Sequence, residues 1–150
     1  KVLQYNMLLD FTDRVAQSQI PVGTSKEVFS CVQFIKNHTN DHIGVMDVAT
    51  HIGKSRAYIA KKFKKEIGMN IGAFITQSKL REAQSLLKYS DMTIAEISNY
   101  LCFSSQSYFQ NVFKNECGIT PAKYRKYELK LQLDIKDKGP HVLSSGTSIR

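Results

Sequence analysis

The sequence predicts an all-α protein, and three observations support this prediction. Segments with helical apolar periodicity follow one another from residue 24 to residue 127, and Ser or Thr caps and Gly stops separate them. One stretch in the first half of the chain recurs in the second half. A longer amphipathic segment, residues 71–89, lies between the two copies. With 42% apolar and 23% charged residues among 150, the composition is that of a globular chain able to bury a core.

The first predicted elements lie before residue 40. Residues 1–20 are expected to hold an N-terminal helix, because helix formers with a broad apolar face fill positions 2–16. A linker that contains Pro and Gly follows. Thr24 and Glu27 form a capping box, which predicts a helix from there to about His38.

Six further helices are predicted from caps and stops. Ser55 and Ser105 are placed as N-caps, Thr93 and Glu96 form another capping box, and Pro121 suits the first position of a helix. Gly residues stand where several of these segments stop. The predicted helices span 46–52, 55–67, 71–89, 93–101, 105–117 and 120–127.

Residues 128–150 form a tail with a different pattern. Apolar side chains alternate with polar ones at Leu129, Leu131, Leu133 and Ile135. A period of two is typical of a strand, but no second strand pattern exists to pair with it. Two interpretations are therefore open: an edge strand that needs a partner, or a frayed extension of the last helix. Residues 139–150 are rich in Ser and Gly and are expected to be mobile.

The chain is strongly basic, with a formal net charge of +8. This excess predicts a polyanionic partner, and nucleic acid is favoured over an anionic membrane surface. A solvated basic surface explains the charge alone equally well. Residues 2–16 carry one Arg against two Asp, which disfavours a helix that binds a membrane surface. No apolar run long enough to span a bilayer and no signal peptide is visible, and we expect the chain to be part of a longer protein.

The cysteines and histidines show no pattern typical of a metal site or a disulfide framework. The number of cysteines, three, is odd, and no CxxC pair occurs. Cys117 is predicted to be a small core residue, and reduced thiols suit the cytoplasm. The histidines are scattered, at His38, His42, His51 and His141. Neither a cofactor nor a metal is expected. We also expect no enzymatic activity, because the sequence lacks a Gly-rich phosphate loop and a nucleophile elbow.

The internal repeat is the most informative feature of the sequence. The segment 55–68 matches the segment 105–118 at a constant offset of 50 residues. Both begin with Ser and share Tyr, Phe, Lys, Glu and Gly at the same later positions. Upstream the match continues at an offset of 49, so the second copy has one extra residue in its turn.

Each copy has the pattern of a helix-turn-helix unit, in which a short helix and a tight turn precede a capped second helix. The second helix of such a unit lies in the DNA major groove, so its outer face has to contact bases and phosphates. The first copy supplies six positive charges in twelve residues: Lys54, Arg56, Lys61, Lys62, Lys64 and Lys65. The residues predicted to be buried are Val48, Ile52, Ile59, Phe63 and Ile67, and Ile97, Leu101, Phe109, Phe113 and Cys117. The doubled pattern favours DNA binding over an ordinary basic helical hairpin.

These residues resemble the DNA-binding domain of the AraC/XylS family of bacterial transcription regulators. The resemblance covers roughly residues 24–126, and its most specific stretches are 103–114 and 118–125. It implies two helix-turn-helix subdomains joined by a long connecting helix, with units at about 24–69 and 90–127 inside a domain of 24–127. It further implies that the partner is double-stranded DNA, with the two recognition helices in successive major grooves. It also implies gene activation in the cytoplasm, with RNA polymerase as a second partner. Many members have an N-terminal effector or oligomerisation domain, and residues 1–20 fit the end of such a domain or the helix leading from it.

The resemblance also assigns site residues by position. The implied base-facing residues are Ala57, Ala60 and Lys61, and Gln106, Ser107, Gln110 and Asn111. The implied phosphate-facing residues are Arg56, Tyr58, Lys64, Lys114, Lys123 and Arg125. Cys102 departs from the family pattern, which usually has Gly there. If the backbone must adopt positive φ, Cys costs ~1–2 kcal/mol and a differently shaped turn is expected. Asn111 stands where the family often has Arg, which weakens the case for guanine recognition.

The two recognition helices differ in chemistry. Lys61 can donate to guanine, and Ala57 can contact a thymine methyl group. Gln110 and Asn111 can form paired hydrogen bonds with adenine. The second helix is therefore expected to carry more sequence information per contact. The alternative is that these amides are ordinary polar residues of a helix surface.

Overall fold

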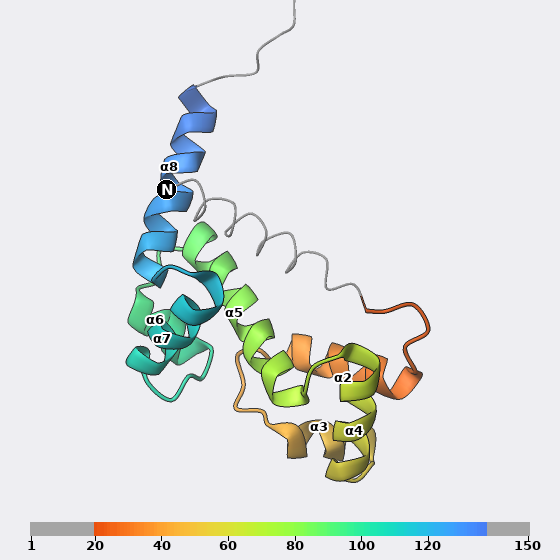
Figure 1. The fold of residues 1–150 in the computed structure, drawn as a ribbon. Helices are drawn as coiled ribbons and strands as arrows, with labels where there is room; N and C mark the ends of the chain where they lie inside the picture. Colours follow the sequence, from red (N-terminus) through yellow and green to blue (C-terminus); the bar gives the residue numbers. More distant parts are fainter. Residues whose placement is uncertain (1–19, 138–150) are drawn as a thin grey trace, which may run out of the picture.

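The computed structural model describes residues 20–137, which fold into helices joined by short turns (Figure 1). The helices are α2 (Lys26–Asn37), α3 (Val45–Ile52), α4 (Arg56–Ile67), α5 (Ile71–Tyr89), α6 (Ile94–Tyr100), α7 (Gln106–Cys117) and α8 (Pro121–Asp137). Within this range no strand occurs, and the all-α prediction is confirmed. The N-terminal helix predicted for positions 2–16, the residues 138–150 and His141 lie outside the described part. None of the helices in residues 20–137 is long and apolar enough to cross a membrane.

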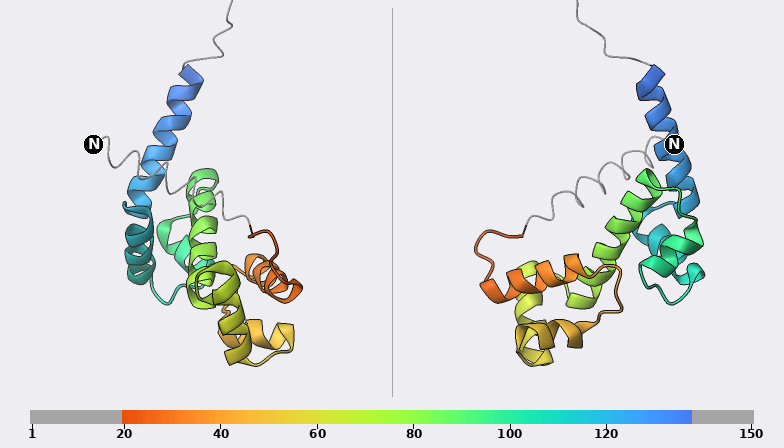
Figure 2. Two further views of the ribbon diagram at one scale, coloured as in Figure 1. Left: turned by 45° about the vertical axis from the view of Figure 1, so that its right-hand side comes forward. Right: turned by 180° about the vertical axis from the view of Figure 1, so that it is seen from behind.

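Two groups of helices are arranged along α5. Helices α2, α3 and α4 gather at its N-terminal end, and α6, α7 and α8 gather at its C-terminal end (Figure 2). We call these groups unit 1 and unit 2. Each has its own hydrophobic core, and α5 contributes to both, with Ile71, Phe74 and Ile75 in the first and Leu80, Ala83 and Leu87 in the second. The predicted apolar stripe of residues 71–89 is thus divided between two cores.

The cores contain most of the residues that periodicity predicted to be buried, but Ile52 and Ile67 are only partly buried and pack at the edge of the first core. Phe63 in unit 1 and Phe109 and Phe113 in unit 2 are fully buried. Cys117 lies in the second core, as expected for a small apolar residue, and burial raises the pKa of its thiol to about 12. Leu86, which the stripe placed in the core, is only partly buried and packs at the edge of the second core.

Most of the predicted caps are present. The Ser55 hydroxyl accepts a hydrogen bond from the Tyr58 amide at 3.3 Å, and the Ser105 hydroxyl accepts one from the Tyr108 amide at 3.0 Å. The predicted capping box at the start of α6 is also formed. The glycines that end α3, α4 and α7 all adopt left-handed backbone conformations. These bonds are local, which explains why the sequence alone predicts them well.

The capping box predicted for Thr24 and Glu27 is wrong. Ser25 is the N-cap of α2, and its hydroxyl accepts a hydrogen bond from the amide of Val28. Thr24 instead closes the preceding turn by donating to the carbonyl of Pro21 at 2.7 Å. The carboxylate of Glu27 reaches away from the cap toward α4, because cations there bind it more strongly than a backbone amide does.

The strand interpretation of the tail is also wrong. Helix α8 continues without a break beyond the predicted end near residue 127 to Asp137. Glu128 is buried and forms an ion pair with Lys88 of α5 at 3.2 Å, which holds this part of α8 against α5. Beyond that contact the apolar side chains are largely exposed, with Leu133 at 62% and Ile135 at 71%. The period of two therefore does not mark a buried face.

Candidate nucleic-acid interface

The outer face of α4 carries the residues assigned to DNA contact in the first half. Ile59 and Phe63 are fully buried, which fixes the side of α4 that faces the core. Ala57, Lys61 and Lys64 are exposed, and Ala60 is partly buried at the edge of this surface. Residues three and four apart share one helix face, so the structure brings these four positions together.

Helix α7 presents the equivalent surface in unit 2. Phe109 and Phe113 are fully buried, as are their counterparts 50 residues earlier. The exposed positions are Gln106, Ser107, Asn111 and Lys114, and Gln110 is half-buried. The repeat therefore places each assigned residue of α7 where the matching residue of α4 lies.

The turns that precede the two recognition helices begin with the same backbone. In unit 1 the amide of Gly53 donates to the carbonyl of Thr50 at 3.1 Å, and φ is 70°. In unit 2 the amide of Cys102 donates to the carbonyl of Asn99 at 3.0 Å, and φ is 56°. Cys102 thus adopts the left-handed conformation in spite of its side chain. The second turn differs from the first further on, where it has one residue more and Ser105 has φ −158° against −67° for Ser55.

The carboxylate of Glu27 in α2 contacts three side chains from α4 and the turn that precedes it. This carboxylate lies 2.6 Å from the Lys62 ammonium and 3.5 Å from that of Lys54, and it accepts a hydrogen bond from the Tyr58 hydroxyl at 3.0 Å. The hydrogen bond from Lys62, and then that from Tyr58, hold the pKa of Glu27 below its ordinary value. Two of the six charges counted in the sequence are thus paired within unit 1, and Tyr58 is turned toward α2.

The remaining phosphate-facing assignments divide into two groups. Arg56, Lys64, Lys114 and Lys123 are exposed side chains. Arg125 is bound by the protein, because its guanidinium donates to the carbonyl of Leu87 at 3.1 Å and to that of Ser90 at 3.4 Å. These carbonyls lie at the C-terminus of α5, where a cation is favourable for the helix dipole. The structure therefore does not group Arg125 with the other cations.

The two units meet at Lys79 in the middle of α5. This side chain is 7% exposed, and its ammonium donates to the carbonyl of Asp41 at 2.8 Å and to that of Leu101 at 2.6 Å. Asp41 precedes α3 in unit 1, and Leu101 ends α6 in unit 2. Burial lowers the pKa of Lys79.

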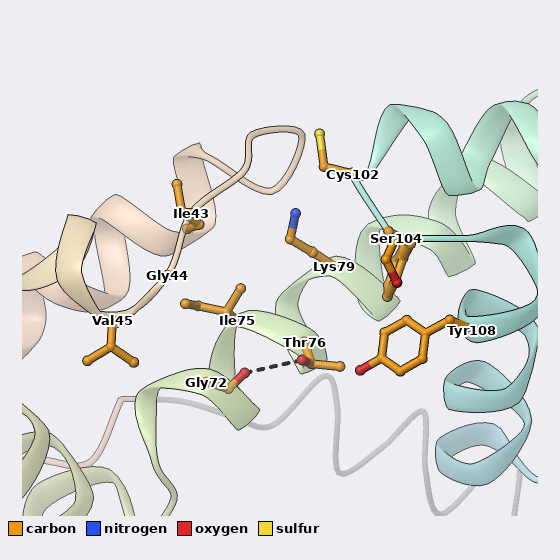
Figure 3. Close-up of a pocket in the computed structure, with 11 residues that line it drawn as sticks. Ile43, Gly44, Val45, Gly72, Ile75, Thr76, Lys79, Cys102, Ser104 and Tyr108 are labelled. Atoms are coloured by element: carbon orange, nitrogen blue, oxygen red, sulfur yellow. Dashed lines mark hydrogen bonds between the residues drawn. The ribbon is translucent and has the colours of Figure 1, made fainter.

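A groove of about 340 Å³ lies beside Lys79 between the two units (Figure 3). Its walls come from the start of α3, from α5 and from the turn before α7, with Tyr108 at one side (Figure 3). Thr76 on the α5 wall donates its hydroxyl to the Gly72 carbonyl at 3.2 Å, so this polar group is already satisfied. Ile43, Val45, Ile75 and Phe103 make much of the remaining lining apolar.

Sequence reasoning missed the roles of Glu27 and Lys79. Glu27 was placed in a cap, and nothing local in the sequence shows that α4 lies beside it. Lys79 had a signal, because Ile75, Lys79 and Ala83 are spaced by four and therefore share the buried face of α5. A cation in such a row needs acceptors from other elements.

Two equivalent units on one connecting helix, each with an exposed recognition helix, define a double helix-turn-helix DNA-binding domain. A family model described as a helix-turn-helix domain matches residues 48–127. The chain belongs to this family, and its relatives are regulators of the AraC/XylS type.

Three comparisons illustrate the relationship. Regulatory protein PocR of Salmonella typhimurium is 34% identical over 71% of this chain and 35% of that protein. The xylose operon regulatory protein of Escherichia coli is 36% identical over 73% of this chain and 28% of that protein. The crystal structure of the DNA-binding domain of AdpA, solved with a target DNA, covers 74% of this chain and 100% of that chain at a TM-score of 0.69 and 22% identity, a likeness of fold. The chain thus spans about a third of the length of the curated relatives.

The left-handed conformation of Cys102 predicts that Cys102→Gly stabilises the protein. Relief of the backbone penalty, offset in part by the greater freedom of Gly in the unfolded chain, should raise the free energy of unfolding by roughly 0.5–1 kcal/mol. Chemical denaturation measures this difference. Cys102→Ala keeps the unfavourable φ and should give no gain, so an equal gain from Ala would contradict the backbone explanation.

The Glu27 contacts predict that Glu27→Gln strengthens binding to random DNA. Removal of the carboxylate frees Lys54 and Lys62 for phosphates, so the salt dependence of binding should steepen by about one phosphate contact for each lysine that engages. Titration of a random duplex at several salt concentrations measures the slope. Asp134→Asn, which changes the net charge equally on the exposed end of α8, should leave the slope nearly unchanged. Equal effects of both variants would mean that net charge alone controls the binding.

Proposed function

We propose that this chain is the DNA-binding part of a transcription regulator and that α4 and α7 enter successive major grooves on one face of the duplex. The observation that carries the proposal is the repetition of one exposed face on two helices, both anchored to α5 through fully buried Phe residues. A major groove accepts one α-helix, and two such helices one turn apart fit a bipartite site.

The chemistry of the two faces supports different roles. In unit 1, Arg56 and Lys64 are exposed beside Lys61, so this helix is suited to phosphate attachment with one donor for guanine. In unit 2, Gln106 and Asn111 are exposed amides, which favour adenine. In this proposal unit 1 provides more of the affinity and unit 2 more of the sequence preference.

The proposal extends to the protein of which this chain would be a part. The matched relatives are about three times as long as their matching region, which supports an effector or oligomerisation domain outside these 150 residues. Two relatives are named as a xylose operon regulatory protein and an F1 operon positive regulatory protein, which supports a role in gene activation. The proposal includes contact with RNA polymerase in the cytoplasm. In this proposal the chain acts by binding and carries out no reaction.

Selection of bound sites from random DNA tests the bipartite mode. We expect two short conserved blocks whose centres are about 10 base pairs apart, since recognition helices about 34 Å apart match one turn of B-DNA. Sequencing of the selected pool gives the blocks and their separation. A single block that survives unchanged when unit 2 carries substitutions on its outer face would overturn the bipartite mode.

A pair of alanine substitutions separates base recognition from phosphate attachment. Gln110→Ala should cost about 1–3 kcal/mol on the selected site and relax the preference at one base pair, with little effect on random DNA. Lys64→Ala should weaken binding to selected and random DNA alike and reduce the salt slope by about one. Competition titrations on both DNAs measure these effects. The reverse pairing of effects would show that the two helix faces are assigned wrongly.

A further inference from the structure

The two hydrophobic cores do not fix the relative orientation of the two units by themselves. They share no residue, and successive turns of α5 contribute to one core and then to the other. A unit that rocks about α5, or a bend in α5, would move one recognition helix relative to the other. A connection across the gap between the units is therefore needed to hold their geometry.

Lys79 lies at this gap. Ile75 on one side of it belongs to the first core, and Leu80 on the other side belongs to the second. Its ammonium is bonded to one carbonyl from each unit, at Asp41 and Leu101. Next to these bonds the thiol of Cys102 lies 3.3 Å from the carbonyl of Asn40. Two consecutive residues of unit 1 thus meet two consecutive residues of unit 2 across Lys79.

The energetics make this contact a connection between the units. A buried ammonium is costly unless its donors are satisfied, and removal of one acceptor exposes most of that cost. An N–H···O hydrogen bond is rarely longer than about 3.2 Å between donor and acceptor, and it weakens steeply when its angle falls below about 120°. A rotation of either unit that carries its carbonyl out of this range would leave the buried ammonium of Lys79 short of an acceptor, so the cation favours relative orientations that keep both bonds.

We propose that Lys79 is a positioning residue that fixes the orientation of the two recognition helices and thereby sets which half-site spacing the chain accepts. This inference rests on the proposed function for its consequence on DNA, whereas the connection between the units can be measured without DNA. Lys79 lies away from the exposed faces of α4 and α7, so its effect on DNA would be indirect.

The first experiment measures the geometry directly. Lys65 and Asn115 are exposed equivalents on α4 and α7, and neither is assigned to DNA contact. Spin labels on unnatural ketone residues at these two positions avoid the native cysteines. Pulsed electron paramagnetic resonance should give one narrow distribution of distances between the labels when Lys79 is present. The distribution should be broader or shifted in the labelled chain that carries Lys79→Met. An unchanged distribution would overturn the connection between the units.

The second experiment measures the consequence on DNA. The selected site is lengthened or shortened between its blocks by one or two base pairs, which rotates the half-sites by roughly 35–70° and shifts them by about 3–7 Å. The unchanged chain should lose at least about 10-fold in affinity, as expected for one mismatched contact or more. Lys79→Met should reduce that loss to about 3-fold or less, with its salt slope on random DNA unchanged.

Matched variants keep the test decisive. Lys88→Met removes a lysine of the same helix that binds within unit 2, at Glu128, and should retain both the narrow distances and the strict spacing. Lys79→Gln retains a neutral donor and replaces Lys79→Met if thermal melting shows that the Met variant is unfolded at the assay temperature. Strict spacing in a folded Lys79 variant would overturn the role in spacing. If the unsubstituted chain binds no DNA but the distances between its spin labels still change with Lys79→Met, the proposed function is refuted and the connection between the units through Lys79 still holds.

Discussion

The structure depends on one constraint: a single helix, α5, has to serve two separate hydrophobic cores. Its N-terminal turns complete the core of unit 1, and its C-terminal turns complete that of unit 2. Both recognition helices, α4 and α7, are anchored by Phe side chains that are buried in these cores. Because α5 contributes to both cores, neither recognition helix would have a defined position without it. The need for two buried stretches on one helix accounts for its length, which exceeds that of every other helix in the described range.

Where local chemistry determines structure, the sequence was sufficient. The bounds of α5 and the caps at Ser55 and Ser105 agree with prediction, because each cap is a bond between residues three apart. The prediction failed where a distant partner competes. Glu27 left its expected cap for α4. For the residues after Tyr127 the sequence left two interpretations open, and the structure shows the helix extension.

The sequence predicted which positions of the candidate site lie on the outer faces of the helices, but it did not predict which residues these side chains contact in the fold. Repetition placed Lys61 and Asn111 on equivalent faces, and the structure exposes both. It could not show that Glu27 forms ion pairs with two lysines, or that Arg125 binds carbonyls at the end of α5. These contacts join residues more than 25 positions apart, and charge patterning along the chain does not reveal them. The basic character of α4 and the turn before it is thus smaller in the folded protein than a count of their residues suggests.

The separation of the two cores has a consequence for how the protein opens. Cooperative units in native proteins follow contiguous packing, and here packing is interrupted at the middle of α5. Local unfolding of one unit would leave the core of the other intact, so amide protons of α3 and α7 would exchange through different openings. The duplication that gives the molecule two recognition helices thus also divides it into two cooperative folding units, which are coupled through the central turn of α5.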